Sequence, residues 1–277
     1  MKVSVIFSTY NMPLWLEKVL WGYECQTYQD FEIIIADDGS GPDTRTLIDD
    51  FKKSSRLNII HVWQEDEGFQ KSRILNKAIL NSTTDYLIFT DGDCIPRNDF
   101  VQVHVTKARA GYFLSGGYFK LPMITSEMIT RDDVIRQRAF DINWLYARGL
   151  EKTYKSMKLT SKGFKADFLN FITPATATWN GHNSSGWKED LLSINGFNED
   201  MKYGGQDREL GERLMNKGIK GIQVRYSAIC IHLDHKREYK TKESVLFNLN
   251  VRKETRRSKK IWTENGLVKQ KEALRTN

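Results

Sequence analysis

The stretch Asp85-Tyr-Leu-Ile-Phe-Thr-Asp-Gly-Asp-Cys94 is the part of this 277-residue sequence that decides the fold. Its apolar run over 85–90 predicts a buried strand, and the strand ends on two carboxylates, Asp91 and Asp93. Two charges at the end of such a strand either cap the following turn or bind something cationic. Asp-Gly-Asp suits a divalent ion held by oxygen ligands, since Gly92 lets the backbone approach closely. The triplet alone leaves both interpretations open.

Three more apolar runs, at 3–8, 31–36 and 57–63, precede this strand, and a helical pattern follows each of them. Strands that alternate with helices predict a parallel, doubly wound sheet, and continuous apolar runs fit a sheet covered on both faces. In such sheets ligands bind beyond the carboxyl ends of the strands. We therefore expect one crevice lined by the side chains that follow these strands: Ser8, Thr9, Tyr10, Asp37, Asp38, Asp91 and Asp93.

The pattern is looser from about residue 115 onward. "LSGGYFKLPM" is typical of strand and turn, and helical stretches are predicted around 131–147, 187–194 and 206–217. "GIQVRYSAICIHLDH" returns to strand and ends on histidines. Without a repeat or a low-complexity linker between the halves, two lobes that share one cleft fit better than two independent domains.

Two groups in the second half are candidates for chemistry. His232 and His235 follow the last strand, and imidazole with carboxylate suits Mn²⁺ or a similar ion; His232 is preferred because it lies nearer the rigid strand. Asp207 lies in the first turn of a helix after two glycines, where the helix dipole favours a carboxylate and where it could act as a general base. Glu209 and Glu212, on the same helix, are expected to face solvent.

Composition and charge narrow the class of protein. The 40% hydrophobic and 28% charged content is that of an ordinary globular protein, and no apolar run approaches the roughly 18 residues of a membrane span. The N-terminus runs directly into "KVSVIF", which is too short and strand-like for a signal peptide. Three widely spaced cysteines fit neither a disulfide framework nor a zinc site, so we expect reduced thiols in a cytoplasmic protein.

The formal net charge of +7 is concentrated in the tail. From residue 236 onward there are 13 Lys/Arg against 5 Asp/Glu, so the rest of the chain is close to neutral. Such a tail suits a solvated helical face, an anionic membrane surface or an anionic acceptor; nucleic acid lacks a supporting motif. Alternatively, the tail packs on the catalytic lobe, with Trp262 as an apolar anchor. We predict peripheral membrane association through this tail, loosened by salt.

Taken in order, "VSVIFSTYN", "IIIADDGS", "EGFQKSRILNKAI" and "IFTDGDC" resemble the nucleotide-binding half of an inverting family-2 glycosyltransferase of the GT-A fold. "GWKEDLLSINGFNEDMKYGGQD" resembles the galactosyltransferase-type C-terminal segment found in β-1,4-galactosyltransferases and bacterial chondroitin polymerase. The matches span roughly residues 3–235, and the ordered set is far more specific than any single motif. The resemblance implies a Rossmann-like, mostly parallel mixed sheet flanked by helices. It divides the chain into a nucleotide-sugar-binding half (1–114), an acceptor and catalytic half (115–235) and a basic helical tail (236–277).

The resemblance also implies a role for each matching residue. It places the metal, Mn²⁺ or Mg²⁺, on Asp93 and His232, and it makes Asp207 the catalytic base. Aromatic contacts to the sugar or acceptor fall to Trp187 and Tyr203. The nucleotide sugar is assigned to Ser8, Thr9 and Tyr10 at the uridine, Asp38 at the uracil edge, Arg73 and Asp91 at the nucleotide and ribose, and Gly205 and Gln206 near the sugar.

One position departs from the family. Members commonly have Gly-Gly-Glu-Asp, whereas this chain has Gly-Gly-Gln206-Asp207. Gln206 keeps its hydrogen-bonding capacity but carries no charge and cannot act as a base. If the family's Glu positions hydroxyl groups, Gln206 can do the same. If that Glu were instead the base, this chain would be impaired, so the assignment of Asp207 as base depends on the first role.

The implied activity is transfer of a hexose or N-acetylhexosamine from a UDP-sugar to a saccharide or lipid-linked saccharide, with a β-linkage, in lipopolysaccharide, capsule or related surface polysaccharide synthesis. A dinucleotide-binding oxidoreductase shares the alternating pattern, but no G-x-G-x-x-G follows the first strand. A non-catalytic nucleotide-sugar-binding protein and a sugar-phosphate nucleotidyltransferase remain as alternatives. The nucleotidyltransferase lacks a Gly-rich basic loop near the first strand.

Overall fold

The computed structural model describes residues 1–236 and 241–268, and its first strands confirm the predicted α/β class. The four apolar runs form β1 (Val3–Thr9), β2 (Phe31–Asp37), β3 (Ile59–Trp63) and β4 (Tyr86–Asp91), each within two residues of its predicted bounds. β3 pairs with β2, β2 with β1 and β1 with β4, all in parallel. Their carboxyl ends therefore lie along one edge of the sheet.

The second half of the chain extends the same sheet. Its strands are β5 (Cys94–Pro96), β6 (Tyr112–Lys120), β7 (Ser184–Trp187) and β8 (Lys220–His232). Within the described ranges the eight strands follow the order β3-β2-β1-β4-β7-β6-β8-β5. β7 is antiparallel to both β4 and β6, whereas β6 and β8 are parallel. The sheet is thus mixed and mostly parallel, as expected.

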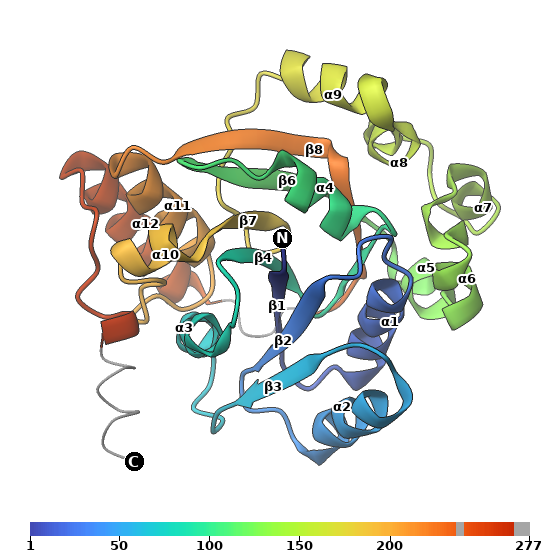
Figure 1. Ribbon diagram of the computed structural model, residues 1–277, viewed down its shortest axis with the longest axis horizontal. Coiled ribbons are helices and arrows are strands. Elements are labelled where there is room, and N and C mark those ends of the chain that lie inside the picture. Colours follow the sequence, from blue (N-terminus) through green and yellow to red (C-terminus); the bar gives the residue numbers. More distant parts are fainter. Residues whose placement is uncertain (237–240, 269–277) are drawn as a thin grey trace.

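Helices cover both faces of the sheet because its buried side chains alternate between two apolar clusters. Val5 and Phe7 of β1 belong to one cluster, which packs against the first helices, and Ile6 belongs to the other. Figure 1 shows α1 and α2 on one side of β1–β3 and α3 with α10 and α11 on the other. The helices are α1 (Pro13–Glu24), α2 (Pro42–Ser54), α3 (Lys71–Asn81), α4 (Phe100–Lys107), α5 (Met123–Met128), α6 (Arg131–Ile135), α7 (Ile142–Tyr146), α8 (Met157–Thr160), α9 (Gly163–Ile172), α10 (Lys188–Ser193), α11 (Gln206–Asn216) and α12 (Lys242–Arg257), with short 3-10 turns at Arg138–Phe140 and Tyr154–Ser156.

β8 reaches the loop after β4 because its register against β6 shifts midway. Gly116 pairs with Val224, but Gly117 pairs with Ile229, so β8 contributes extra residues at this bulge. A side chain at Gly116 would collide with Asn183, which explains a glycine inside a strand. The last residue of β8, His232, then pairs with Cys94 of β5. The end of β8 is thereby placed beside the Asp-Gly-Asp turn.

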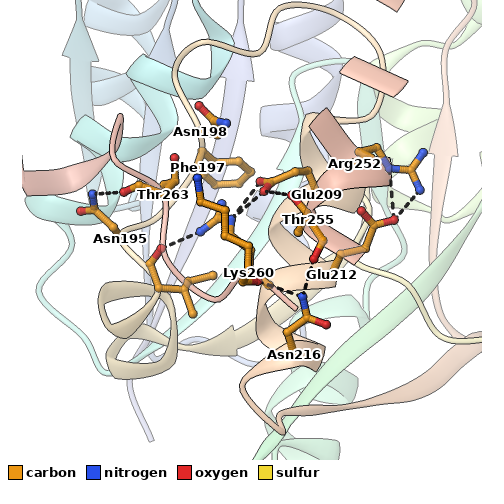
Figure 2. A network of polar contacts seen from close by, with 12 residues as sticks. Asn195, Phe197, Asn198, Glu209, Glu212, Asn216, Arg252, Thr255, Lys260 and Thr263 are labelled. Carbon is orange, nitrogen blue, oxygen red and sulfur yellow. Dashed lines mark hydrogen bonds and ion pairs between the residues drawn. The ribbon is translucent and has the colours of Figure 1, made fainter. Parts of the chain in front are cut away.

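The basic tail packs on the fold through one face of α12. Asn248 and Thr255 of this helix are buried, and Thr255 Oγ1 donates a 3.1 Å hydrogen bond to Glu209 of α11. Figure 2 shows this network together with Arg252, whose guanidinium lies 2.6 Å from Glu212. The expectation that Glu209 and Glu212 face solvent is therefore wrong, because both carboxylates are buried by α12 and by cationic partners.

A different residue from Trp262 anchors the end of the described tail. Trp262 is 40% exposed, whereas Leu267 is 2% exposed and belongs to the apolar cluster on the α11 side. Asn195 fixes this segment by donating to Thr263 O at 2.7 Å and accepting from Val268 N at 2.8 Å. The opposite face of α12 exposes Lys242, Leu246 and Lys253.

Among the described residues, no helix combines the length and the apolar character needed to cross a lipid bilayer.

Candidate active site

A cavity of about 440 Å³ lies at the carboxyl edge of the sheet, where the ends of β1, β4 and β8 meet. Most of the strand-end side chains predicted to share a crevice do share it. Asp37 does not: it is fully buried, accepts a hydrogen bond from Ser40 N at 2.8 Å and pairs with His61 at 2.9 Å. The cavity is lined by Ser8, Thr9, Tyr10, Met12, Asp38, Gly68, Phe69, Lys71, Asp91, Gly92, Asp93, Tyr118, Gly181, His182, Tyr203, Gln206, Asp207, His232 and His235.

The turn after β4 is held against β1 by its glycine. Gly92 N donates a 2.8 Å hydrogen bond to Ser8 O, and a Cβ at Gly92 would lie only 2.8 Å from that same oxygen. Only glycine allows this approach. Asp91 is thereby directed into the cavity, where it accepts a 2.6 Å hydrogen bond from Lys71 Nζ.

Lys71 is the cation that Asp91, the first of the two carboxylates of the opening stretch, meets. It lies in the first turn of α3, and its side chain is 15% exposed. Burial by itself would lower the pKa of Lys71, but the carboxylates of Asp91 and Asp207 hold that pKa above its usual range. Lys71 therefore stays protonated and places a fixed positive charge on the cavity wall.

Asp93 and two histidines form a second cluster. Asp93 Oδ2 lies 2.9 Å from His235 Nε2 and 3.8 Å from His232 Nε2, and the two imidazole rings are parallel at 5.7 Å. Burial would raise the pKa of Asp93, but His232 and His235 outweigh it and lower that pKa to about 2. The structure thus brings both histidines to Asp93, including the one that the sequence disfavoured.

This cluster fits a divalent cation. Nδ1 of His232 contacts Leu233 O at 2.7 Å, and Nδ1 of His235 contacts Lys236 O at 2.7 Å. Each backbone carbonyl fixes the ring so that Nε2 is the nitrogen left toward Asp93, an arrangement typical of metal-ligating histidines. One carboxylate and two imidazoles are a donor set suited to Mn²⁺ and related ions. The buried thiol of Cys94 lies within 4.8 Å of the ligand atoms of Asp93 and His232.

Asp207 faces the cavity from the start of α11. It follows Gly205, which caps the helix in a left-handed conformation with φ of 100°, and Gln206. Burial raises the pKa of Asp207 above its ordinary value, while the Lys71 ammonium opposes the rise. Asp207 Oδ1 is buried and accepts no hydrogen bond from any described residue. A carboxylate with a raised pKa and an unused lone pair has the properties of a general base.

The other end of the cavity is suited to a nucleobase. Tyr10 is 44% exposed, and its hydroxyl donates a 2.8 Å hydrogen bond to Asp66. Asp38 accepts hydrogen bonds from Gln64 Nε2 at 2.7 Å and from Gln70 N at 2.9 Å. Burial raises the pKa of Asp38 to about 6, although these two hydrogen bonds oppose the rise. The carboxylate is fixed in place and keeps further acceptor capacity.

The loop before Asp207 is supported from both sides. Gly204 N donates a 3.0 Å hydrogen bond to Gln206 Oε1, so the amide that replaces the family's Glu braces its own loop. Asn248 of α12 donates to Lys202 O at 2.8 Å and to Gly204 O at 3.2 Å. The tail helix therefore fixes the backbone that carries Gln206 and Asp207.

Three of the predicted site residues do not line the cavity. Arg73 forms a 2.6 Å ion pair with Glu67, and Gly205 packs against Arg252. Trp187 pairs with Tyr86 at the amino end of β4, the opposite end from Asp91, so a sugar contact at Trp187 does not fit its position. Tyr203 does line the cavity, edge-on to Phe69 at 5.8 Å.

Sequence reasoning missed several lining residues. Lys71 lies two positions before Arg73, and its place at the helix start is the signal that could have favoured it. His182 and Gly181 belong to an irregular loop and have no motif. Burial lowers the pKa of His182 to about 4, so this ring is neutral against Tyr118, 4.4 Å away. The Cβ position of Gly181 lies 2.7 Å from Asp207, so a glycine is needed there.

Comparison with known protein families gives two matches that together cover most of the chain. Residues 4–166 match glycosyl transferase family 2. Residues 165–236 match a family described as the N-terminal domain of galactosyltransferase, here in the C-terminal part of the described fold. The first match contributes Asp91 and Asp93, and the second contributes Asp207 and His232.

Curated relatives agree with these matches. The chain is 25% identical to the uncharacterized glycosyltransferase YfnE of Bacillus subtilis (90% of this chain, 69% of YfnE). It is 28% identical to the validoxylamine A glucosyltransferase of Streptomyces hygroscopicus subsp. jinggangensis (88% and 58%). It is 26% identical to the chondroitin synthase of Pasteurella multocida (78% and 23%). The matched region thus spans little more than half of the validoxylamine enzyme and about a quarter of the chondroitin synthase.

Solved structures confirm the fold. The mannosyltransferase PcManGT of Pyrobaculum calidifontis, in complex with GDP-Man and Mn²⁺, aligns with a TM-score of 0.58 at 19% identity (86% of this chain, 58% of that chain). TarS of S. aureus, residues 1–349 in complex with UDP-GlcNAc, aligns with a TM-score of 0.58 at 14% identity (86% and 60%). These similarities show that the chain shares its fold with both enzymes.

Proposed function

The chain belongs to glycosyl transferase family 2, and on this premise we propose that it transfers a hexose or N-acetylhexosamine from a UDP-sugar to a saccharide acceptor, with inversion and with a divalent cation. The observation that supports this most is the convergence on one cavity of the Asp93–His232–His235 cluster, the Lys71–Asp91 pair and Asp207. A nucleotide sugar needs a cationic wall for its diphosphate, and an attacking hydroxyl needs a base.

The donor would lie across the carboxyl edge of the sheet. Ser8, Thr9 and Tyr10 would contact the uridine, and Asp38 would accept the uracil N3–H. Lys71 would take over the role that we expected for Arg73, because its ammonium lines the cavity and remains charged. The GDP-Man and UDP-GlcNAc complexes of PcManGT and TarS support a nucleotide-sugar donor in a fold of this kind.

Asp93, His232 and His235 would hold the cation, Mn²⁺ or Mg²⁺. When bound there, such an ion offsets the negative charge that develops on the diphosphate as it leaves. Lys71, whose ammonium lies 2.6 Å from Asp91, supplies a second, permanent positive charge on the same wall.

Asp207 would act as the base in a single displacement. The acceptor hydroxyl loses its proton to Asp207 while its oxygen forms a bond to the anomeric carbon. The bond from that carbon to the β-phosphate oxygen breaks, and UDP leaves with the electron pair. Because attack comes from the face opposite the leaving group, a UDP-α-sugar gives a β-linkage. Holding both substrates in one cleft supplies the entropic part of the rate enhancement.

We propose the same division of labour along the chain as the sequence indicates: donor binding in 1–114, acceptor binding and catalysis in 115–235, and a tail from 236 onward. Two parts of this tail, residues 237–240 and 269–277, lie outside the described residues. The relation to chondroitin synthase supports a role in capsule, lipopolysaccharide or other surface polysaccharide synthesis. The basic tail suits peripheral attachment at the cytoplasmic face of a membrane, where lipid-linked acceptors are elongated.

A panel of UDP-sugars tests this proposal. We expect one of UDP-Gal, UDP-GalNAc, UDP-Glc and UDP-GlcNAc to bind in the presence of Mn²⁺ and to be hydrolysed slowly, with release of UDP. The variant Asp93→Asn should lose the Mn²⁺-dependent part of binding. Release of UDP also separates a transferase from a non-catalytic binding protein and from a nucleotidyltransferase, which would release pyrophosphate. Binding that is indifferent to Mn²⁺ and to Asp93 would contradict the metal-dependent mechanism.

A further inference from the structure

A second groove, of about 490 Å³, lies between α11 and α12. It is lined by four cationic side chains and one carboxylate: Arg208, Arg252, Arg256, Lys259 and Glu212. A solvated helical surface carries charges of both signs, whereas this groove has an excess of three positive charges. Nothing in the proposed transfer mechanism uses them.

The carboxylate of the groove neutralises only part of this charge. Glu212 Oε1 lies 2.6 Å from Arg252 and 3.8 Å from Arg256. Arg208 and Lys259 are exposed, and among the described residues neither has a carboxylate within ion-pair distance. Two cations, one on α11 and one just past the end of α12, therefore face the groove without an anionic partner among the described residues.

The groove also contains an unused acceptor. Glu212 is only 6% exposed, and its Oε2 atom is buried without a hydrogen-bond donor among the described residues. A buried carboxylate oxygen without a donor costs free energy. A hydroxyl group entering the groove beside Arg252 would supply that donor.

The backbone at Lys259 points to the same use. α12 ends in a Schellman turn, in which Lys260 N donates to Thr255 O at 3.1 Å and Lys259 occupies the left-handed position with φ of 53°. Glycine is the residue favoured there, because other residues are strained in this conformation. The chain keeps a lysine at a position where glycine would be more stable, and the lysine lines the groove.

The groove begins close to the candidate active site. Arg208 directly follows Asp207, and Arg252 lies against Gly205 at the start of α11. Asn216, at the far end of the groove, lies nine residues after Asp207 on the same helix, which is about 13 Å at the usual helical rise. That length matches two or three sugar units attached to the reacting one.

We propose that this groove binds an oxyanion on the acceptor glycan, either the carboxylate of a sugar acid or the phosphate of a phosphorylated sugar. The identification of the bound molecule as the acceptor rests on the proposed function. Arginine side chains suit both groups because the guanidinium donates two parallel hydrogen bonds to a carboxylate or a phosphate. Hydroxyl groups on the same sugar would reach Glu212. The groove thus selects anionic over neutral acceptors.

The test uses the whole chain and three probes: glucuronate, glucose 6-phosphate and neutral glucose. Binding is measured by calorimetry with and without saturating UDP and Mg²⁺, so that the donor cavity is either filled or empty. We expect glucuronate or glucose 6-phosphate to bind in both conditions and glucose to bind more weakly. Preference for one anion identifies the carboxylate or the phosphate as the natural group.

The double variant Arg256→Ala/Lys259→Gly should weaken binding of the preferred anion by about tenfold or more, since a hydrogen bond to a charged group contributes about 1.5–3 kcal/mol. Lys259→Gly suits the left-handed backbone, so the melting temperature should not fall because of it. Lys253→Ala removes an exposed cation from α12 outside the groove and serves as the matched control. It should leave anion binding unchanged.

Two results would overturn the inference: no preference of the wild-type protein for either anion over glucose, or unchanged anion affinity in the double variant. UDP binding is measured on the same samples. Its absence in the wild-type protein would count against the proposed function, whereas anion binding without UDP still reports on the groove itself.

Discussion

At the scale of single residues, the environment of Asp207 sets it apart from the other acids of the cavity. Asp91 is paired with Lys71, and Asp93 lies against two histidines, but Oδ1 of Asp207 has no donor among the described residues. Its pKa is raised mainly by burial. An acid whose pKa is raised and that has an oxygen without a donor is the one best placed to take up a proton.

Replacement Asp207→Asn should therefore lower the transfer rate by about 10²–10⁴-fold, the usual contribution of a general base. Mn²⁺-dependent UDP binding should stay within about threefold of wild type, since the change is isosteric and lies away from the Asp93 cluster. Single-turnover transfer and equilibrium UDP titration measure the two effects separately. Transfer that persists at the wild-type rate would remove Asp207 from the role of base.

Asp38 provides a pH-dependence at the same scale. Its pKa of about 6 lies above the ordinary value, so the carboxylate becomes protonated as the pH falls through about 6. Only the ionised carboxylate has both oxygens free to accept a hydrogen bond from the uracil N3–H. We expect uridine, measured without metal so that the histidine cluster plays no part, to bind several-fold more tightly at pH 7.5 than at pH 5.

The variant Asp38→Asn is the control for this pH effect. It should bind uridine weakly and with the same affinity across that pH range. A wild-type affinity that is flat between pH 5 and 7.5 would mean that Asp38 does not contact the base.

At the scale of elements, the buried Arg213–Glu209 ion pair within α11 also holds the loop after α10, through the guanidinium of Arg213. Arg213 is fully buried; its guanidinium contacts Glu209 at 2.9 Å, Ile194 O at 2.6 Å and Gly196 O at 2.7 Å. α12 completes the network through Thr255 (Figure 2). Such a pair fixes the orientation of α11, and with it the position of Asp207 at the start of the helix.

Loss of one partner should therefore be costly. Arg213→Met leaves Glu209 charged and buried, and it should lower the free energy of unfolding by about 3–5 kcal/mol. The double variant Arg213→Met/Glu209→Met should recover much of that loss, because no uncompensated charge remains. Urea unfolding of the single and the double variant is compared with that of Arg208→Met, a change on the exposed side of the same helix. Equal destabilisation by Arg208→Met would contradict this account.

The elements differ in how well the sequence predicts them. β1 to β4 and α1 to α3 follow from apolar periodicity and from Pro13 and Pro42 at helix starts, because local pattern and burial agree there. The bulge of β6 against β8 depends on Asn183, distant in sequence, and no local pattern encodes that contact. The burial of Glu209 is a similar case, since it depends on α12 packing over a face that looks polar.

The same contrast holds for the candidate site. Asp91, Asp93, Asp207 and His232 belong to motifs at the ends of regular elements, so their positions could be predicted. Lys71 and Arg73 occur in one helical turn. The sequence does not decide between them, because only the packing of α3 determines which side chain faces the cavity. Trp187 lies at the amino end of β4 because β7 runs antiparallel to β4, and the sequence does not reveal this strand direction.

At the scale of the whole molecule, charge is distributed asymmetrically, and α12 carries a cationic and apolar outer face. Lys242, Lys253 and Leu246 are exposed there, while the inner face of the helix packs on α11. The chain should float with vesicles that contain anionic phospholipid and not with neutral vesicles. Raising the salt concentration to about 0.5 M should release it, because screening weakens exposed charge interactions.

Charge reversal tests whether this face is responsible. Lys242→Glu/Lys253→Glu should reduce flotation, whereas Lys52→Glu/Lys53→Glu, at exposed positions of α2, changes net charge equally and should leave it intact. Flotation that does not depend on anionic lipid would remove membrane attachment from the proposal.

The pairing of Cys94 with His232 joins the two family segments at one seam. Asp93 enters this seam from the first segment and His235 from the second, so neither segment by itself holds all of the proposed metal ligands. A chimera that replaces residues 165–236 with those of a relative must therefore carry over a compatible β5 as well. Engineers who wish to graft a new sugar preference onto this scaffold have more freedom in the peripheral helices than along the β5–β8 junction.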